Sequence, residues 1–312
     1  MKLSPSPIAA ALPNSSPVAS LAISPNSEEV MIGQTADATN PALSRWRVSD
    51  FSSVSGPTPC PMAAGTDSCS SLSWILEDEL VAVSLSGQKL TVINLTNGTW
   101  SAPVEGRVVR ASVKGSLLST SGARTQIHDA ATGRTVWQQA PSAPLAKNNP
   151  SRVPVVTFHP SEETFAVGGT GEPIISVHSL DGSSAVKRMV GAPPRLQGLS
   201  YGPQGKYLVA LDAAARSTVV WRTEEAEPHL PEIFGEEAEQ YCSVAFHPDG
   251  MHCAMGMLSG YIDVYRLLDG AMVDSRKGHS MRVQALSFTS DGSLLLSGGD
   301  DGKLLAWPVI QA

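Results

Sequence analysis

The stretch that decides the fold is the segment 278–307, which reads GHSMRVQALSFTSDGSLLLSGGDDGKLLAW. It contains two apolar–polar runs joined by the turn Ser290–Gly292, and a third run that follows the turn Asp300–Gly302. Short alternating runs that end in Gly, Asp or Asn are typical of β-strands joined by tight turns. The segment therefore predicts a small antiparallel sheet whose third strand ends on Trp307.

Six weaker copies of this unit lie upstream. The residue equivalent to Trp307 ends a third run in each copy, and these residues are Tyr265, Trp221, His178, His128, Asn94 and Trp46. Neighbouring members of the series are 34 to 50 residues apart, which brackets the ~40–45 residues of a four-stranded propeller blade. Two runs precede each of these positions, and a weaker fourth run follows several of them. The pattern predicts an all-β fold with four antiparallel strands per repeat.

Seven copies predict a single domain over residues 1–312, a seven-bladed β-propeller. The approximate blades are 17–50, 68–103, 106–140, 152–191, 194–235, 240–277 and 280–312. No segment with a helical period of useful length interrupts them, as an all-β fold requires.

The final copy resembles a WD repeat, because it begins near Gly-His and ends its third strand on Trp. In that family a buried network joins a His, a Ser or Thr, an Asp and the Trp. The resemblance implies these structural roles for His279, Ser297, Asp301 and Trp307. Pro308 stands where the family has Asp, and the other six copies lack the full set.

The seventh copy stops after its third run and has no fourth run of its own. The resemblance implies that a segment from the other end of the chain supplies the missing outer strand. Residues 2–12 precede the first blade and are available for this pairing, which would cover an exposed sheet edge. We therefore expect an outer closing strand from residues 2–12.

Charge and hydropathy exclude some partners. The net charge is −7, and the 22 Lys and Arg residues form no basic run, whereas proteins that bind phosphate backbones usually concentrate positive charge on one face. Direct nucleic-acid binding is therefore not expected. No stretch reaches the ~18 apolar residues that cross a membrane, and prolines interrupt the apolar run at the N-terminus. We expect an intracellular protein, cytoplasmic or nuclear.

No set of residues predicts catalysis, a cofactor or a metal. His159 and His247 share one turn position in different repeats, so they are not expected to bind a common metal. The spacing of the cysteines matches no zinc motif, and these residues are Cys60, Cys69, Cys242 and Cys253. The glycine-rich segment 168–171 lacks both GxGxxG spacing and a following helix. A small-molecule binder or enzyme using the central channel would need charged residues repeated at one position, which the repeats do not show.

Three insertions interrupt the repeat, at 51–69, 140–152 and 223–240, and surface insertions often bind partners. The third is acidic and contains three apolar residues that are candidates for docking a partner, namely Leu230, Ile233 and Phe234. The alternative is a solvated loop whose apolar side chains pack onto the neighbouring blades.

The sequence thus favours a non-catalytic scaffold, a rigid subunit of a hetero-oligomeric assembly that binds other proteins or peptides. The resemblance implies docking at the top face, where loops before each third strand line the central opening. Candidate contacts in these loops are Asp212, Ser259 and Asp300. An alternative is an adaptor that recruits a peptide to an RNA-processing, transport or ciliary complex.

Overall fold

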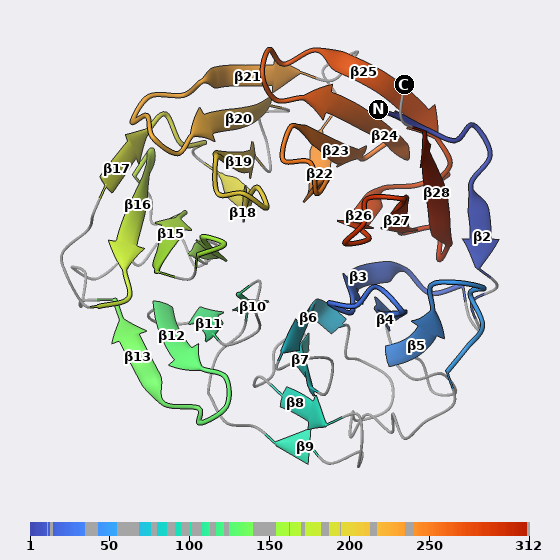
Figure 1. Ribbon diagram of the computed structural model, residues 1–312, viewed down its shortest axis with the longest axis horizontal. Helices are drawn as coiled ribbons and strands as arrows, with labels where there is room; N and C mark the ends of the chain where they lie inside the picture. Colours follow the sequence, from blue (N-terminus) through green and yellow to red (C-terminus); the bar gives the residue numbers. More distant parts are fainter. Residues whose placement is uncertain are drawn as a thin grey trace.

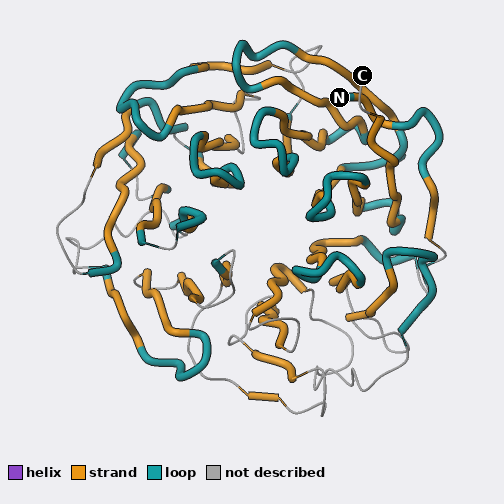
Figure 2. The backbone as a smooth tube through the Cα atoms, viewed as in Figure 1, coloured by secondary structure: helices purple, strands orange, loops and turns teal. Residues whose placement is uncertain are grey.

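A computed structural model describes residues 1–310 of the chain except 11, 13–14, 35–42, 55–68, 76–79, 86–90, 95–99, 102–107, 113–116, 122–124, 140–153, 162, 170–171, 182–186, 194, 213–216 and 235–239. The described residues contain strands and turns but no helix (Figure 2). Their strands form seven antiparallel sheets, which we number in chain order. The prediction of an all-β fold made of antiparallel sheets is confirmed.

Sheets one to three come from the N-terminal part of the chain. Sheet one contains β3 (Val18–Ile23), β4 (Glu29–Gln34) and β5 (Leu43–Arg47). Sheet two contains β6 (Cys69–Ile75), β7 (Leu80–Leu85), β8 (Thr91–Asn94) and β9 (Trp100–Ser101). Sheet three contains β10 (Val108–Ala111), β11 (Leu117–Ser121), β12 (Thr125–Asp129) and β13 (Thr135–Gln138).

Sheets four to six each have four strands. Sheet four contains β14 (Val155–Phe158), β15 (Thr164–Gly168), β16 (Ile174–Ser179) and β17 (Lys187–Val190). Sheet five contains β18 (Leu196–Tyr201), β19 (Tyr207–Asp212), β20 (Ser217–Arg222) and β21 (Leu230–Phe234). Sheet six contains β22 (Tyr241–Phe246), β23 (His252–Met257), β24 (Tyr261–Arg266) and β25 (Met272–Lys277).

Sheet seven joins the two ends of the chain. Its C-terminal strands are β26 (Val283–Phe288), β27 (Leu294–Gly299) and β28 (Leu304–Ile310). Two short N-terminal strands, β1 (Lys2–Leu3) and β2 (Ile8–Ala10), both pair antiparallel with β28. The expectation of one outer strand over residues 2–12 is therefore corrected to two strands. Pro5 and Pro7 lie between them, and proline has no N–H to donate to a sheet.

The seven sheets are arranged around a common centre, with the first strand of each sheet innermost (Figure 1). These first strands contact one another in an unbroken series, β3 to β6, β10, β14, β18, β22, β26 and back to β3. The apolar core lies between neighbouring sheets, because the two faces of each sheet pack against the sheets on either side. One such cluster combines Ile262 and Val264 of sheet six with Leu305 and Trp307 of sheet seven.

The N-terminal segment is held by both of the last two sheets. Leu3 is fully buried in the cluster between sheets six and seven. Its N–H donates to Asp274 Oδ2 over 2.7 Å, and its carbonyl oxygen accepts from Arg276 Nε over 3.3 Å. Further along, Ala10 and Leu12 pack against the cluster that sheet seven shares with sheet one. The segment therefore contacts three successive sheets.

Part of the predicted insertions is not loop. Residues 230–234 of the acidic insertion form β21, the outer strand of sheet five. The interpretation of 223–240 as a loop between repeats is therefore corrected for these residues. Because the insertion as a whole is acidic, its sequence suggested a loop, but the backbone of these residues pairs with β20. The insertion 140–152, most of the insertion 51–69 and Cys60 lie outside the described residues.

Candidate functional site

The turns and connections divide the molecule into two faces. The first, which we call the His279 face, carries the β23–β24 turn, the β27–β28 turn and the β25–β26 connection. The second, the Asp291 face, carries the β22–β23, β24–β25 and β26–β27 turns. Strands of an antiparallel sheet reverse direction at each turn, so alternate turns of one sheet belong to opposite faces.

The residues predicted to form a network in the last repeat are hydrogen-bonded to one another. His279 Nδ1 lies 2.9 Å from Asp301 Oδ1, and His279 Nε2 lies 2.8 Å from Ser297 Oγ. Trp307 Nε1 donates to the same Ser297 oxygen over 2.9 Å. These bonds tie the β25–β26 connection and the β27–β28 turn to the interior of sheet seven.

The Gly-His start of the repeat has a steric reason. A Cβ atom at Gly278 would collide with the six-membered ring of Trp307. The indole of Trp307 is fully buried and reaches Ser297 only because the backbone at residue 278 leaves this space. Glycine is therefore required where the chain passes over the tryptophan.

The partners fix the tautomer of His279. A carboxylate only accepts hydrogen bonds, so Nδ1 carries the proton that is donated to Asp301, and Nε2 accepts from the Ser297 hydroxyl. Burial lowers the pKa of His279, although Asp301 opposes this shift. Burial would raise the pKa of Asp301, but hydrogen bonds from His279 and from the Ser280 N–H lower it below the usual value. The pair is thus a neutral imidazole beside a carboxylate.

This arrangement contains the residue types of a Ser-His-Asp triad but does not present a nucleophile. Ser297 is fully buried, and its oxygen already accepts from Trp307. A catalytic serine needs an oxygen that a substrate can approach. The geometry supports a structural role for the four residues, which stays a prediction until the variants described below are measured.

The buried histidines predict an acid-sensitive fold. Burial lowers the folded-state pKa of His279, and also that of His128 and of His178. In the unfolded chain these groups bind protons near pH 6.5, so the unfolded state takes up more protons as the pH falls and stability is lost below about 6.5. Urea unfolding at pH 7.5 and 5.5 should show a free energy of unfolding lower by roughly 1 kcal/mol or more at pH 5.5. An equal or higher value at pH 5.5 would contradict this.

Asp300, next to the network residue Asp301, faces the centre of the molecule. Its carboxylate accepts from Arg282 Nε over 3.0 Å and from Gln284 Nε2 over 2.9 Å. Cys242 lies close enough for both charged groups to affect it, but burial dominates and raises the pKa of its thiol to about 11. Asp300 remains a candidate contact, as a half-buried carboxylate that already has a cationic partner.

The other two candidates from these loops are less accessible. Asp212 is only 2% exposed, so its carboxylate is not offered to a partner in this structure. Ser259 lies in the β23–β24 turn, and its hydroxyl oxygen is buried without a hydrogen-bond partner among the described residues. Ser259 lies in the loop that its sequence position predicts, whereas Asp212 is the last residue of β19.

Of the three apolar residues predicted to dock a partner from the acidic insertion, the structure describes the side chain of Leu230 alone. Leu230 is half-buried and packs against the core cluster between sheets five and six. Ile233 and Phe234 belong to β21 and pair with Thr218 and Ser217. The side chains of these last two residues lie outside what is described, so their docking role stays a prediction.

Sequence reasoning missed a second buried polar network, in sheet six. Tyr241 Oη lies 3.0 Å from Asp263 Oδ2 and 2.7 Å from Tyr265 Oη, and Ser275 Oγ donates to Asp263 Oδ1 over 2.6 Å. Burial, with the neighbouring Tyr265 and Asp263, raises the pKa of Tyr241. The sequence does contain a sign of this network. Tyr265 stands at the repeat position equivalent to Trp307, and a buried phenol hydroxyl needs a hydrogen-bond partner.

A central cavity of about 290 Å³ lies between the first strands. Serine and glutamine side chains supply its polar lining, and they are Ser20, Ser71, Ser200, Ser243, Gln197 and Gln284. None of its lining residues is charged. Such a cavity offers hydrogen bonds and the buried thiol of Cys242.

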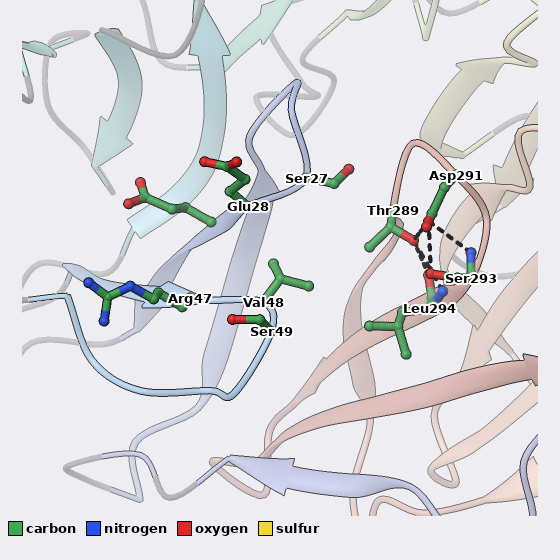
Figure 3. Close-up of a pocket in the computed structure, with 10 residues that line it drawn as sticks. Ser27, Glu28, Arg47, Val48, Ser49, Thr289, Asp291, Ser293 and Leu294 are labelled. Atoms are coloured by element: carbon green, nitrogen blue, oxygen red, sulfur yellow. Dashed lines mark hydrogen bonds between the residues drawn. The ribbon is translucent and has the colours of Figure 1, made fainter.

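A larger hollow of about 510 Å³ opens on the Asp291 face, between sheets one and seven. Figure 3 shows Thr289, Asp291 and Ser293 bonded to one another on one wall, while the Glu28 and Arg47 side chains extend away from them. Ser27 bridges the two sheets, since Ser290 N–H donates to Ser27 Oγ over 2.8 Å. The charged groups do not converge, so the hollow is not organised around a ligand.

The described part of the chain offers no group of three or more His, Cys, Asp or Glu side chains placed to hold a metal ion. Within the same residues, no helix has the length and apolar character needed to span a membrane. The cysteines that the structure describes, Cys69, Cys242 and Cys253, are buried and form no disulfide with one another.

Comparisons with known proteins agree with the repeat. The family model described as "WD domain, G-beta repeat" matches residues 270–307. Telomerase protein component 1 of Rattus norvegicus is 24% identical over 95% of this chain and 12% of its own length. The WD repeat-containing protein VIP3 of Arabidopsis thaliana is 25% identical over 47% of this chain and 49% of its own length. Echinoderm microtubule-associated protein-like 2 of Homo sapiens is 28% identical over 48% of this chain and 23% of its own length.

The family match, the network of the last repeat and the repeated antiparallel sheets agree with one another. The chain contains a WD repeat at residues 270–307 and is similar to WD-repeat proteins over a longer part of its length. Members of this family generally act as scaffolds for protein interactions. The chain spans only 12% of the telomerase component that it matches along nearly all of its own length.

Proposed function

We propose that this chain is a seven-bladed WD-repeat propeller, closed by its N-terminal segment, that serves as a rigid non-catalytic scaffold in a multiprotein assembly. The unbroken series of contacts between the first strands supports the seven-bladed ring. The pairing of β1 and β2 with β28 supports the closure. A ring of this kind loses little conformational entropy when loops on its faces bind a partner.

The distribution of exposed apolar side chains carries this proposal. Ten large hydrophobic side chains are exposed among the described residues, and six of them lie between Met251 and Met281. These six are Met251, Leu258, Tyr261, Leu268, Met272 and Met281. They lie on sheet six and its connections, with Leu258 and Met281 on the His279 face and Met251 and Leu268 on the Asp291 face. Adjacent exposed apolar groups mark interaction surfaces, whereas single ones need no explanation. Sheet six and its connections are therefore the proposed centre of the scaffold's contacts.

Chemical cross-linking of the complex isolated from its source, followed by mass spectrometry, tests the proposal. We expect cross-links from other subunits to concentrate on lysines beside the exposed region, such as Lys277. Cross-links confined to sheets three and four, or a chain that is isolated only as a monomer, would contradict it.

The predicted intracellular location, cytoplasmic or nuclear, also stays a prediction.

A second candidate is an adaptor within an RNA-containing assembly, and one observation favours it. The relative that matches 95% of this chain is named as a component of telomerase. The net charge of −7 argues that such a role would run through protein contacts. Association that survives ribonuclease treatment would support this adaptor role, and association lost on treatment would contradict a protein-mediated contact.

A further inference from the structure

Two loops meet on the His279 face where sheet six joins sheet seven. The Gly260 carbonyl oxygen accepts from the His279 N–H over 3.3 Å. Gly260 has φ +90, and a Cβ atom there would collide with the backbone of His279 and Met281. The β23–β24 turn is therefore packed directly on the β25–β26 connection, in a conformation that favours glycine.

Three apolar side chains are exposed at this junction. Leu258 is 52% exposed, Met281 is 53% exposed and Tyr261 is 38% exposed. Leu258 and Tyr261 flank Gly260 in sequence, and Met281 follows the residues on which Gly260 rests. We call these three residues the junction patch. The hydrogen-bonded loops beneath them hold the patch in place before any partner binds.

The edge of the junction patch is positively charged. Lys277 Nζ lies 5.1 Å from the centre of the Tyr261 ring, and Lys303 is exposed on the adjoining β27–β28 turn. Neither lysine forms an ion pair within the described residues. The nearby carboxylates are already engaged, since Asp300 pairs with Arg282 and Asp301 with His279. An anionic group that approaches the patch therefore meets unpaired cations.

Resting on the scaffold function proposed above, we infer that the junction patch is a docking site for a partner peptide that combines apolar and acidic side chains. Apolar residues of the peptide cover Leu258 and Met281, and its carboxylates pair with Lys277 and Lys303. A nucleic acid is a poorer match. Of the three patch residues only Tyr261 has a ring on which a base could stack, and Lys277 Nζ lies over that ring. The patch selects against basic peptides, since an uncompensated like charge is unfavourable at an interface.

Selection from a phage-displayed library of random 12-residue peptides on the immobilised full chain tests the inference. The enriched peptides should contain Asp or Glu together with Leu, Ile, Phe or Met. The tightest peptide is then labelled with fluorescein, and its Kd is measured by anisotropy. The double variant Leu258→Ser/Met281→Ser should weaken binding about tenfold or more, because central apolar contacts dominate interface energies. The double variant Lys277→Glu/Lys303→Glu should weaken binding and increase selection of basic peptides.

A matched control is available in sheets three and four. Val136 of β13 and Val190 of β17 are 42% and 36% exposed, and the variant Val136→Ser/Val190→Ser removes exposed apolar side chains that lie outside sheets six and seven. It should leave the Kd unchanged. If binding depends on Met251 and Leu268 instead, the junction patch is wrong while the scaffold function stands. If no peptide is enriched over a surface without protein, both are contradicted. A labelled 12-nucleotide single strand that binds more tightly than any peptide would overturn the choice of partner.

Discussion

A chain that lacks residues 1–12 is expected to unfold at a clearly lower temperature than the full chain. The deletion removes β1 and β2, and with them every backbone bond on the outer edge of β28. It also removes Leu3, which is fully buried, and leaves the buried Asp274 without the Leu3 N–H. Burial of a leucine side chain contributes about 1.5–3 kcal/mol and each net hydrogen bond about 1 kcal/mol. The total loss should be about 4 kcal/mol or more, a fall in Tm of roughly 6 °C or more.

Two point variants separate the contributions in this segment. Leu3→Ala should cost about 2–4 kcal/mol, because it leaves a cavity between sheets six and seven. Ile8→Ser lies in the same segment but changes a side chain that is 51% exposed, and it should change stability by no more than about 0.5 kcal/mol. Thermal unfolding followed by circular dichroism measures all three. An unchanged Tm in the deletion would show that β1 and β2 do not stabilise sheet seven.

His279→Ala is expected to have the second largest effect. Without the imidazole, the Ser297 hydroxyl has no acceptor for its proton, and Asp301 loses its side-chain donor in a nearly buried position. Breaking a buried pair of this kind typically costs about 3–5 kcal/mol. Backbone N–H groups of Ser280 and Lys303 still bond to Asp301, so we expect a loss of about 3 kcal/mol, near the lower end. Urea unfolding followed by tryptophan fluorescence, which sums the signals of the six tryptophans, measures the loss.

His159→Ala is the control for this variant. His159 lies at the start of the turn after β14, where its half-buried ring bonds to Ser161 and packs edge-on against Tyr201. Its removal should cost about 1 kcal/mol or less. If the two variants cost the same, the buried network of sheet seven adds nothing beyond an ordinary histidine contact, and its structural role is wrong.

Much of the fold could be predicted because strands and turns have local signals. The seven residues that end the third apolar run of each repeat all lie in the third strand of a sheet. They are Trp46, Asn94, His128, His178, Trp221, Tyr265 and Trp307. The period of two along each run and the Gly or Asp between runs are properties of a few neighbouring residues. They need no knowledge of distant contacts.

The remaining features depend on contacts that a local pattern does not encode. Residues 230–234 pair with the edge of β20, although the insertion around them is acidic and Pro231 lies within them. Asp212 is only 2% exposed, although an aspartate beside a turn is expected from sequence to face solvent. The junction patch exists because Gly260 rests on a connection about twenty residues further along the chain. Such features follow from packing between sheets.

The pairing of β1 with β28 has a consequence for the order of folding. The bond from Leu3 N–H to Asp274 joins residues 271 positions apart, and the register partner of Lys2 is Ile310. During synthesis, Lys2 and Leu3 stay unpaired until Val309 and Ile310 have also been made. Sheets one to six can form from neighbouring strands, whereas sheet seven depends on the meeting of two distant ends, a slow step when loop closure is long. The last step of folding should therefore be the one that joins the two ends of the chain.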